Sequence, residues 1–225
     1  MSPDRSIVVS SPLPCRPGLR VAVRVQGEGD PLLLINGMTR PLESWDPVTQ
    51  ELQGRKVISF DSPGVGGSRT PLRPLSITEL TTIALAVLDD AGVDAADVLG
   101  YSHGGAVAQQ LAFDAPDRVQ RLILVATSCG VGATPGTSRA ILRGIGGPVE
   151  GNTWPIPDPL GMLWQSLAVS TWSSIPFLGA IRAPTLVVCG SRDRVVPPPN
   201  SKILASFVED FLSAGRAAER LRVAG

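Results

Sequence analysis

The sequence predicts a doubly wound α/β fold, in which helices cover both faces of a mostly parallel β-sheet. Three observations predict it: short runs of branched apolar residues, amphipathic helical patterns between these runs, and a length of 225 residues, which suits one α/β domain with a large core. Strands that are apolar on both faces are typical of a parallel sheet between layers of helices. Their alternation with helices indicates the doubly wound arrangement.

The predicted strands differ in pattern according to their place in the sheet. Residues 19–26 alternate apolar with more polar positions, which is the period of a half-exposed strand near a sheet edge. The other runs are continuously apolar, as buried strands are. They lie at residues 32–35, 57–60, 98–101, 122–125 and 185–188.

Two helices are indicated most clearly. One begins at Ser76, where Glu79 three residues later completes a capping box, and it ends at Gly92. The last predicted helix presents its apolar residues on a single face. These residues are Ile203, Leu204, Phe207, Val208, Phe211 and Leu212.

The strand–helix pattern breaks at residues 130–183, where glycines, prolines and three of the four tryptophans gather. We interpret this segment as an abbreviated lid inserted over the carboxyl edge of the sheet. The core of the fold then comprises residues 1–129 and 184–225.

Composition excludes several classes of function. The chain carries 20 basic and 20 acidic side chains, and a net charge of zero argues against binding to nucleic acid or to an anionic membrane surface. The uncharged stretch at residues 159–181 contains too many polar residues for a lone spanning helix, so we expect no membrane-spanning segment. Three widely spaced cysteines without a CxxC motif, and the lack of a signal-peptide pattern, favour a reducing compartment, so we expect the protein in the cytoplasm.

The strongest chemical signal is a G-x-S-x-G motif with Ser102 at its centre, between Gly100 and Gly104. It follows a predicted buried strand and precedes a helical pattern, which is the context of a nucleophile elbow. Such a turn holds the serine out at the top of the sheet, close to the N-terminus of the next helix. A glycine-rich turn without catalytic meaning is the alternative interpretation. We predict that Ser102 is a nucleophile.

Two loops after other strands complete the predicted site. The Asn36-Gly37-Met38 segment follows the strand at residues 32–35, where an elbow fold takes one backbone N–H of its oxyanion hole. We predict that the N–H groups of Met38 and His103 are the two donors. Backbone donors have no side-chain signature in a sequence, so a turn without a catalytic role is the alternative for residues 36–38. Asp193 lies beyond the strand at residues 185–188, where the orienting carboxylate is expected, and a solvated loop aspartate is its alternative.

Three segments resemble the α/β-hydrolase superfamily: the elbow, the loop after the first buried strand, and the FDSPGVGGS run at residues 60–68. Residues 172–176 (WSSIP) and the PTLVV strand leading to Asp193 resemble the intracellular poly(3-hydroxyalkanoate) depolymerases, whose neighbours are esterases of similar sequence. The resemblance spans residues 31–205. It implies an α/β-hydrolase fold, Ser102 as nucleophile, Asp193 as acid, and a small acyl ester or polyester of a hydroxyalkanoic acid as substrate. It implies no cofactor and no metal.

The sequence departs from these families after Asp193. Their members have one more strand there, followed by a turn that carries the catalytic histidine. None of the residues after Asp193 in this sequence is histidine, and the sole histidine is His103. Adjacent residues on an elbow point to different sides, so we interpret His103 as a helix residue packed beside the sheet; a distorted elbow or a base from another chain are the alternatives. We expect an impaired enzyme, because serine is a poor nucleophile without a base.

The sequence is compatible with more than one function. The chain is either an impaired ester hydrolase or a catalytically silent pseudo-hydrolase that binds acyl ligands or a partner; a cofactor-free perhydrolase would need the same missing base. Asn36, Trp164 and Trp172 are candidates for lining a substrate pocket. For the tryptophans, together with Trp154, the core of the lid is the favoured interpretation. Loss of the last strand would expose a sheet edge, through which we expect a homodimer.

Overall fold

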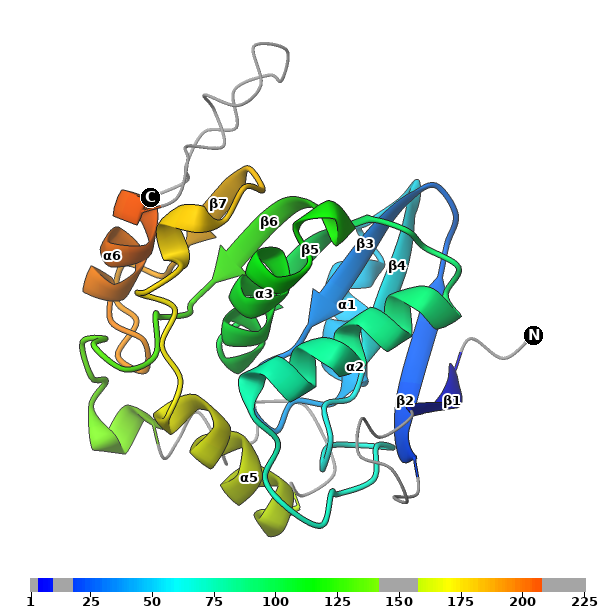
Figure 1. Cartoon of the computed structure of the whole chain (residues 1–225), viewed down its shortest axis with the longest axis horizontal. Coiled ribbons are helices and arrows are strands. Elements are labelled where there is room, and N and C mark those ends of the chain that lie inside the picture. Colours follow the sequence, from blue (N-terminus) through cyan, green and yellow to red (C-terminus); the bar gives the residue numbers. More distant parts are fainter. Residues whose placement is uncertain (1–3, 10–17, 142–157, 208–225) are drawn as a thin grey trace.

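Seven strands form one sheet in the computed structural model, which describes residues 4–9, 18–141 and 158–207. Their order is β1-β2-β4-β3-β5-β6-β7; β1 and β2 pair antiparallel, and the strands from β4 to β7 pair parallel. Helices lie on both faces of this sheet, with α2 and α3 side by side on one face and α1 on the other (Figure 1). The strands are Asp4–Val9, Leu19–Gln26, Asp30–Ile35, Arg55–Phe60, Ala96–Tyr101, Val119–Val125 and Thr185–Val188. The predicted doubly wound, mostly parallel sheet is confirmed.

The described residues include the α-helices α1 (Asp46–Thr49), α2 (Ile77–Asp90), α3 (His103–Asp114), α5 (Pro159–Ser170) and α6 (Pro199–Phe207). Three short 3₁₀ segments are η1 (Leu42–Trp45), η2 (Pro116–Arg118) and η3 (Leu178–Ala180). No helix among the described residues is both long enough and apolar enough to cross a membrane.

The predicted capping box starts α2. The Ser76 hydroxyl accepts the Glu79 N–H at 3.2 Å, and the Glu79 carboxylate accepts the Ser76 N–H at 2.9 Å. Gly92 stands just beyond the helix with φ +65°, a conformation that glycine adopts without a steric cost. The predicted last helix is α6, which the structure describes as far as Phe207; Val208, Phe211 and Leu212 lie outside the described residues.

One strand was not expected. β1 pairs antiparallel with β2, from Asp4 opposite Arg24 to Val9 opposite Leu19, and it takes the edge of the sheet. Its residues are mostly exposed, so they show no apolar alternation that would have indicated a strand. The predicted strand at residues 19–26 therefore stands second from the edge.

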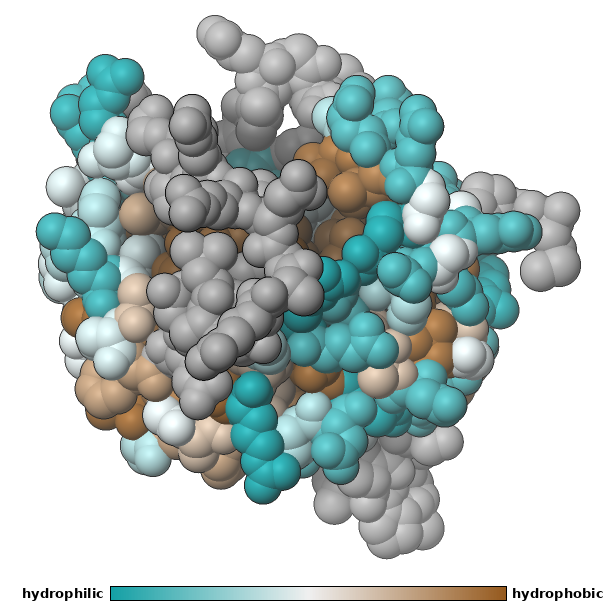
Figure 2. All heavy atoms as spheres, turned by 90° about the horizontal axis from the view of Figure 1, so that it is seen from above, coloured by the Kyte–Doolittle hydropathy of each residue, from teal (hydrophilic) through white to brown (hydrophobic). Residues whose placement is uncertain are grey.

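The opposite edge of the described sheet is β7, which pairs with β6 alone. Val188 at its end is exposed, and α6 packs beside the strand. The described residues contain no further strand beyond β7. A homodimer through this edge stays a prediction. On the face seen from above, exposed hydrophobic residues form separate patches among hydrophilic ones (Figure 2).

The described part of the predicted lid includes α5, which lies at the border of the molecule below α3 and α2 (Figure 1). Gly130 and Ser173 form an antiparallel bridge that closes the base of the insertion. α5 comes so close to the loop after β4 that a Cβ on Gly161 would lie 2.3 Å from the carbonyl oxygen of Gly64. The division into a core and a lid at residues 130–183 stays a prediction.

Asp97, near the amino-terminal end of β5, links neighbouring strands of the sheet through ion pairs. This buried carboxylate on β5 accepts hydrogen bonds from Arg55 on β4 at 2.6 Å and from Arg121 on β6 at 2.5 and 2.8 Å. Arg55 also donates to the Pro31 carbonyl on β3 at 3.2 Å. Burial raises the pKa of Asp97, but the hydrogen bonds from Arg121 and Arg55 outweigh burial and hold that pKa below its ordinary value.

Replacing Asp97 by alanine should lower the free energy of unfolding by about 2–3 kcal/mol, because two guanidinium groups lose a buried charged partner. Arg121 is half exposed and can be rehydrated, which keeps the loss below that of a fully buried pair. Urea unfolding of wild type and Asp97→Ala measures this loss of unfolding free energy. Asp117→Ala, at an exposed site without an ion pair among the described residues, is the matched control and should change stability by less than about 0.5 kcal/mol. Equal losses in the two variants would contradict the role given to Asp97.

Candidate active site

Ser102 is the single residue between β5 and α3, and its backbone has φ 52° and ψ −117°. A positive φ is strained for a residue with a side chain, so the surroundings must hold it in place. The Ser102 N–H donates to the Val125 carbonyl on β6 at 2.9 Å. The Ser102 carbonyl accepts the Gly105 N–H at 2.9 Å and the Thr127 hydroxyl at 2.7 Å. This is the geometry of a nucleophile elbow.

The glycines around Ser102 are required by close backbone approach. A Cβ on Gly104 would lie 2.1 Å from the Ile35 carbonyl oxygen, and a Cβ on Gly105 would lie 2.4 Å from the Thr127 hydroxyl. A Cβ on Gly100 would lie 2.6 Å from the Cβ of Ala108. Side chains at these positions would push α3 away from β3 and β5, and the turn could not form.

The predicted oxyanion loop lies against the elbow. A Cβ placed on Gly37 would stand 3.4 Å from the Cβ of Ser102 and 2.9 Å from the ring of Tyr101. The buried Asn36 side chain accepts the Gly37 N–H at 2.9 Å and donates to the Pro41 carbonyl at 3.0 Å. Asn36 therefore holds the shape of this loop, and its place in a substrate pocket stays a prediction.

The two predicted oxyanion donors come from the ends of β3 and β5. Among the described residues, no protein acceptor is assigned to the Met38 N–H. His103 is the first residue of α3, where backbone N–H groups lack intrahelical acceptors. Both N–H groups are therefore available to a ligand, and their role in an oxyanion hole stays a prediction.

The His103 ring is turned into the protein. The side chain is only 5% exposed, and its ring lies beside the backbone of Gln165 on α5. Burial lowers its pKa to about 4, so the ring is neutral at pH 7. Its Nε2 atom has no partner within the described part of the chain.

Asp193 follows β7 in a tight turn. Its Oδ1 accepts the N–H groups of Val195 at 2.8 Å and Val196 at 2.9 Å, which fixes the carboxylate, while no donor among the described residues is assigned to Oδ2. β5 and β7 both flank β6 and run parallel to it, so Ser102 and Asp193 leave the sheet at the same edge. The structure therefore brings them to one end of the molecule.

The two predicted pocket tryptophans have different surroundings. Trp164 donates its indole N–H to the Pro71 carbonyl at 3.1 Å and lines a small pocket together with Pro63 and Leu80. Trp172 is buried against α3, where its indole N–H donates to the Gln110 side chain at 2.7 Å. Trp172 thus packs in the main hydrophobic core. A substrate-binding role for either residue stays a prediction.

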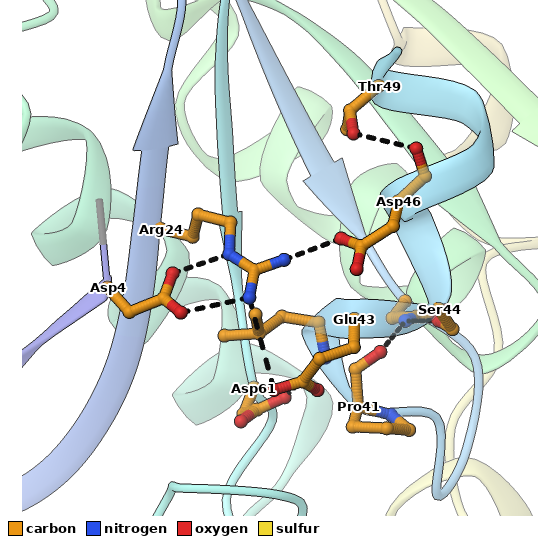
Figure 3. A network of polar contacts seen from close by, with 10 residues as sticks. Asp4, Arg24, Pro41, Glu43, Ser44, Asp46, Thr49 and Asp61 are labelled. Carbon is orange, nitrogen blue, oxygen red and sulfur yellow. Dashed lines mark hydrogen bonds and ion pairs between the residues drawn. The ribbon is translucent and has the colours of Figure 1, made fainter. Parts of the chain in front are cut away.

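Asp61 connects the loop after β3 to the loop after β4 through hydrogen bonds. Its buried carboxylate accepts the N–H of Leu42 at 2.7 Å and the N–H of Gly67 at 2.8 Å. Burial raises the pKa of Asp61 to about 6, against the opposing effect of these hydrogen bonds. Its environment includes Glu43 and Arg24, and Arg24 in turn binds acidic residues on either side (Figure 3).

Gln165 and Thr39 were missed by the sequence analysis. Thr39 follows Met38 and has φ 61°, and the buried Gln165 side chain accepts its N–H at 3.1 Å. The signal was present in α5, because Gln165 shares the buried face of that helix with Gly161 and Ala168. No cluster of three potential metal-binding side chains occurs among the described residues.

A sequence profile of the α/β hydrolase fold family matches residues 30–143, just over half of the chain. The chain belongs to the α/β hydrolase fold family. A poly(3-hydroxyalkanoate) depolymerase of Ectopseudomonas oleovorans is 34% identical to it over an alignment that is 206 residues long with its gaps. The aligned part covers 78% of this chain and 72% of that relative. The putative carbamate hydrolase RutD of Azorhizobium caulinodans is 40% identical over 102 residues, covering 45% of this chain and 38% of that one.

Solved structures of α/β hydrolases superpose on most of the chain. A hydrolase from Pseudomonas aeruginosa PA01 matches with a TM-score of 0.79 at 24% identity, over 92% of this chain and 87% of that one. Est816, described as an N-acyl homoserine lactone degrading enzyme, matches with a TM-score of 0.74 at 27% identity, over 90% and 88% of the two chains. The predicted resemblance and fold are confirmed, and by family the chain is an ester hydrolase.

Gly104→Ala should destabilise this α/β hydrolase by about 2–3 kcal/mol, because the new methyl group meets the carbonyl oxygen of Ile35 and the backbone must shift. Chemical denaturation measures it. Gly190→Ala is the control, since the nearest atom to its Cβ would be 3.9 Å away, and it should stay within about 1 kcal/mol of wild type. A stable Gly104→Ala variant would contradict the close approach of α3 to β3.

The raised pKa of Asp61 predicts a pH dependence of stability. Its folded pKa of about 6 exceeds the ordinary value of 3.8, so proton uptake favours the folded state. This contribution is fully present below the unfolded pKa and is lost as the pH rises through 6. The free energy of unfolding of wild type minus that of Asp61→Asn should therefore increase by about 1 kcal/mol from pH 7.5 to pH 5. A difference that does not vary with pH would refute the assignment.

Proposed function

We propose that this chain carries a serine esterase site in which Ser102 is the nucleophile and Asp193 is the acid. The N–H groups of Met38 and His103 would form the oxyanion hole. The observation that carries the proposal is the strained Ser102 backbone on a tight elbow, with the Asn36–Met38 loop packed against it. Structures rarely retain such strain except at functional sites.

The chemistry follows from these positions. The Ser102 Oγ attacks the ester carbonyl carbon, and two backbone N–H groups stabilise the negative charge that develops on the carbonyl oxygen. The alcohol then leaves, and water hydrolyses the acyl-enzyme. All these groups come from the protein, so the proposed reaction uses no cofactor. The depolymerase relative at 34% identity supports an ester or polyester of a hydroxyalkanoic acid as substrate.

The weak point of this site is its base. His103 is the sole histidine of the sequence; it is buried and neutral at pH 7, and among the described residues no hydrogen bond joins its ring to Asp193. In a serine hydrolase, loss of the base reduces kcat by about a millionfold. We therefore propose that hydrolysis by these 225 residues alone is strongly impaired.

The buried His103 also supports a second candidate function. A chain that keeps the elbow and the loops but lacks a base can bind acyl ligands without turning them over. Such a pseudo-hydrolase would show a ligand-dependent rise in melting temperature with octanoate, because a ligand that binds the folded state alone stabilises it.

The decisive measurement is hydrolysis of p-nitrophenyl octanoate by wild type and by Ser102→Ala, each with and without added imidazole. Without imidazole, the two rates should be nearly equal. With imidazole as an external base, wild type should exceed Ser102→Ala by at least about 10-fold, since general bases contribute about 100-fold or more.

The other outcomes are also informative. Robust turnover by wild type without imidazole, absent in Ser102→Ala, would show that a base exists and would overturn the proposed impairment; His103→Ala is then the next variant. No Ser102-dependent rate even with imidazole would reject the esterase site and leave the pseudo-hydrolase, which the octanoate melting experiment then tests.

A further inference from the structure

Gln165 is an uncharged polar residue on the inner face of the lid helix α5, and only 3% of it is exposed. A buried side-chain amide costs free energy unless its donor and acceptor are both used. Neither the fold nor the esterase chemistry described above requires an amide at this point. Its partners therefore indicate what the residue does.

Both ends of the Gln165 amide are used on loops of the core. Its Oε1 accepts the Thr39 N–H at 3.1 Å, and its Nε2 donates to the Pro63 carbonyl at 3.4 Å. Thr39 is the residue after Met38, in the loop that follows β3. Its φ of 61° lies in the left-handed region, which is unfavourable for a β-branched side chain.

The peptide group between Met38 and Thr39 is held at both of its polar atoms. Gln165 binds its N–H, and the Thr39 hydroxyl donates to its carbonyl oxygen, which belongs to Met38, at 2.6 Å. A peptide group is planar, so fixing both atoms fixes the orientation of the whole unit. The Met38 N–H belongs to the preceding peptide group, which is joined to this fixed unit through the φ and ψ rotations of Met38 and whose Gly37 carbonyl accepts the Arg40 N–H at 3.2 Å.

The same turn of α5 contacts the other predicted donor. The backbone of Gln165 lies beside the His103 ring, and the neighbouring Ser166 hydroxyl lies 3.5 Å from the Met38 sulfur. Two consecutive residues of one helix thus contact both Met38 and His103. These are the residues whose N–H groups form the proposed oxyanion hole.

We propose that Gln165 is a positioning residue that sets the oxyanion hole by clamping the strained Thr39 backbone beside Met38. The inference rests on the esterase site proposed above. The position of α5 on the core is then coupled to the geometry of the oxyanion hole, because the buried Gln165 side chain takes part in both. Lifting α5 would release the Thr39 N–H and let the strained loop relax.

The test uses three variants. Gln165→Met keeps the length of the side chain but removes its acceptor and donor. Gln165→Glu restores an acceptor for the Thr39 N–H. Thr70→Val is the matched control, because it removes a different contact between α5 and the core. This contact is the hydrogen bond from Thr70 to Asp158, which lies at the start of α5 and not at the Gln165 position that contacts Thr39.

The first readout is amide hydrogen exchange of Thr39 by NMR, which does not depend on catalysis. Exchange in the folded protein should be at least about 10-fold faster in Gln165→Met than in wild type, since the amide loses its acceptor. Thr70→Val should match wild type. Unchanged exchange in Gln165→Met would overturn the clamp.

The second readout is reaction of Ser102 with ethyl 4-nitrophenyl hexylphosphonate in imidazole buffer. The Ser102 oxygen bonds to phosphorus, the bond from phosphorus to 4-nitrophenolate breaks, and imidazole takes the hydroxyl proton. The maximal rate constant should fall about 10-fold or more in Gln165→Met, by analogy with loss of an oxyanion donor, while the half-saturating concentration stays nearly constant. Gln165→Glu should recover part of the rate.

The two readouts separate the inference from the proposed function. A wild-type protein that phosphonate does not label, with Thr39 still protected, would reject the esterase site and with it the positioning role. Labelling of Gln165→Met at the wild-type rate would reject the positioning role alone. An equal loss of rate in Thr70→Val would also reject it, because general docking of α5 would then explain the effect.

Discussion

The close approach of backbone atoms at the elbow is the constraint on which the rest of the site depends. The N-terminus of α3 sits against the end of β3 at a distance that leaves no room for a methyl group on Gly104. This approach holds Ser102 in a conformation that it would not adopt in a free peptide. It also brings the loop after β3 against the serine, so one packing contact positions both the proposed nucleophile and one side of the predicted oxyanion hole. The sheet supplies the rigidity, because β3 and β5 are adjacent, parallel and buried.

Buried polar side chains then fix the loops that leave this edge. Asn36 closes the loop after β3 on itself, Asp61 joins that loop to the one after β4, and Gln165 brings the lid helix onto both. Each is nearly inaccessible to solvent, and each uses its polar atoms on backbone groups that would otherwise be buried without partners. Apolar residues of the same size would pack as well but would leave those backbone groups unsatisfied. The polar residues therefore specify the shape of the loops more than they stabilise the fold.

The same packing explains why the neighbour of Ser102 is a poor base. His103 begins α3, and on the first turn of a helix that is packed against a sheet its side chain points into the protein. Burial then lowers its pKa to about 4, well below the value that suits a general base at neutral pH. In the proposed site His103 would contribute its backbone N–H, while its ring packs beside α5. A base for that site would have to be a group other than His103.

Local sequence patterns were enough to predict the fold class, the six strands from β2 to β7, both ends of α2 and the elbow. These patterns are apolar runs, a capping box and glycines at fixed spacing. The sequence did not determine β1, whose exposed residues take their structure from pairing with β2. Nor did it determine the partners of Asp61 and Gln165, since a hydrogen bond to a distant backbone group depends on the partner's position and not on its side chain. Two features could be seen only in the folded molecule: Trp172 packs on α3, and α5 reaches the loop beside Ser102. These facts depend on contacts between residues far apart in the sequence, which no local pattern records.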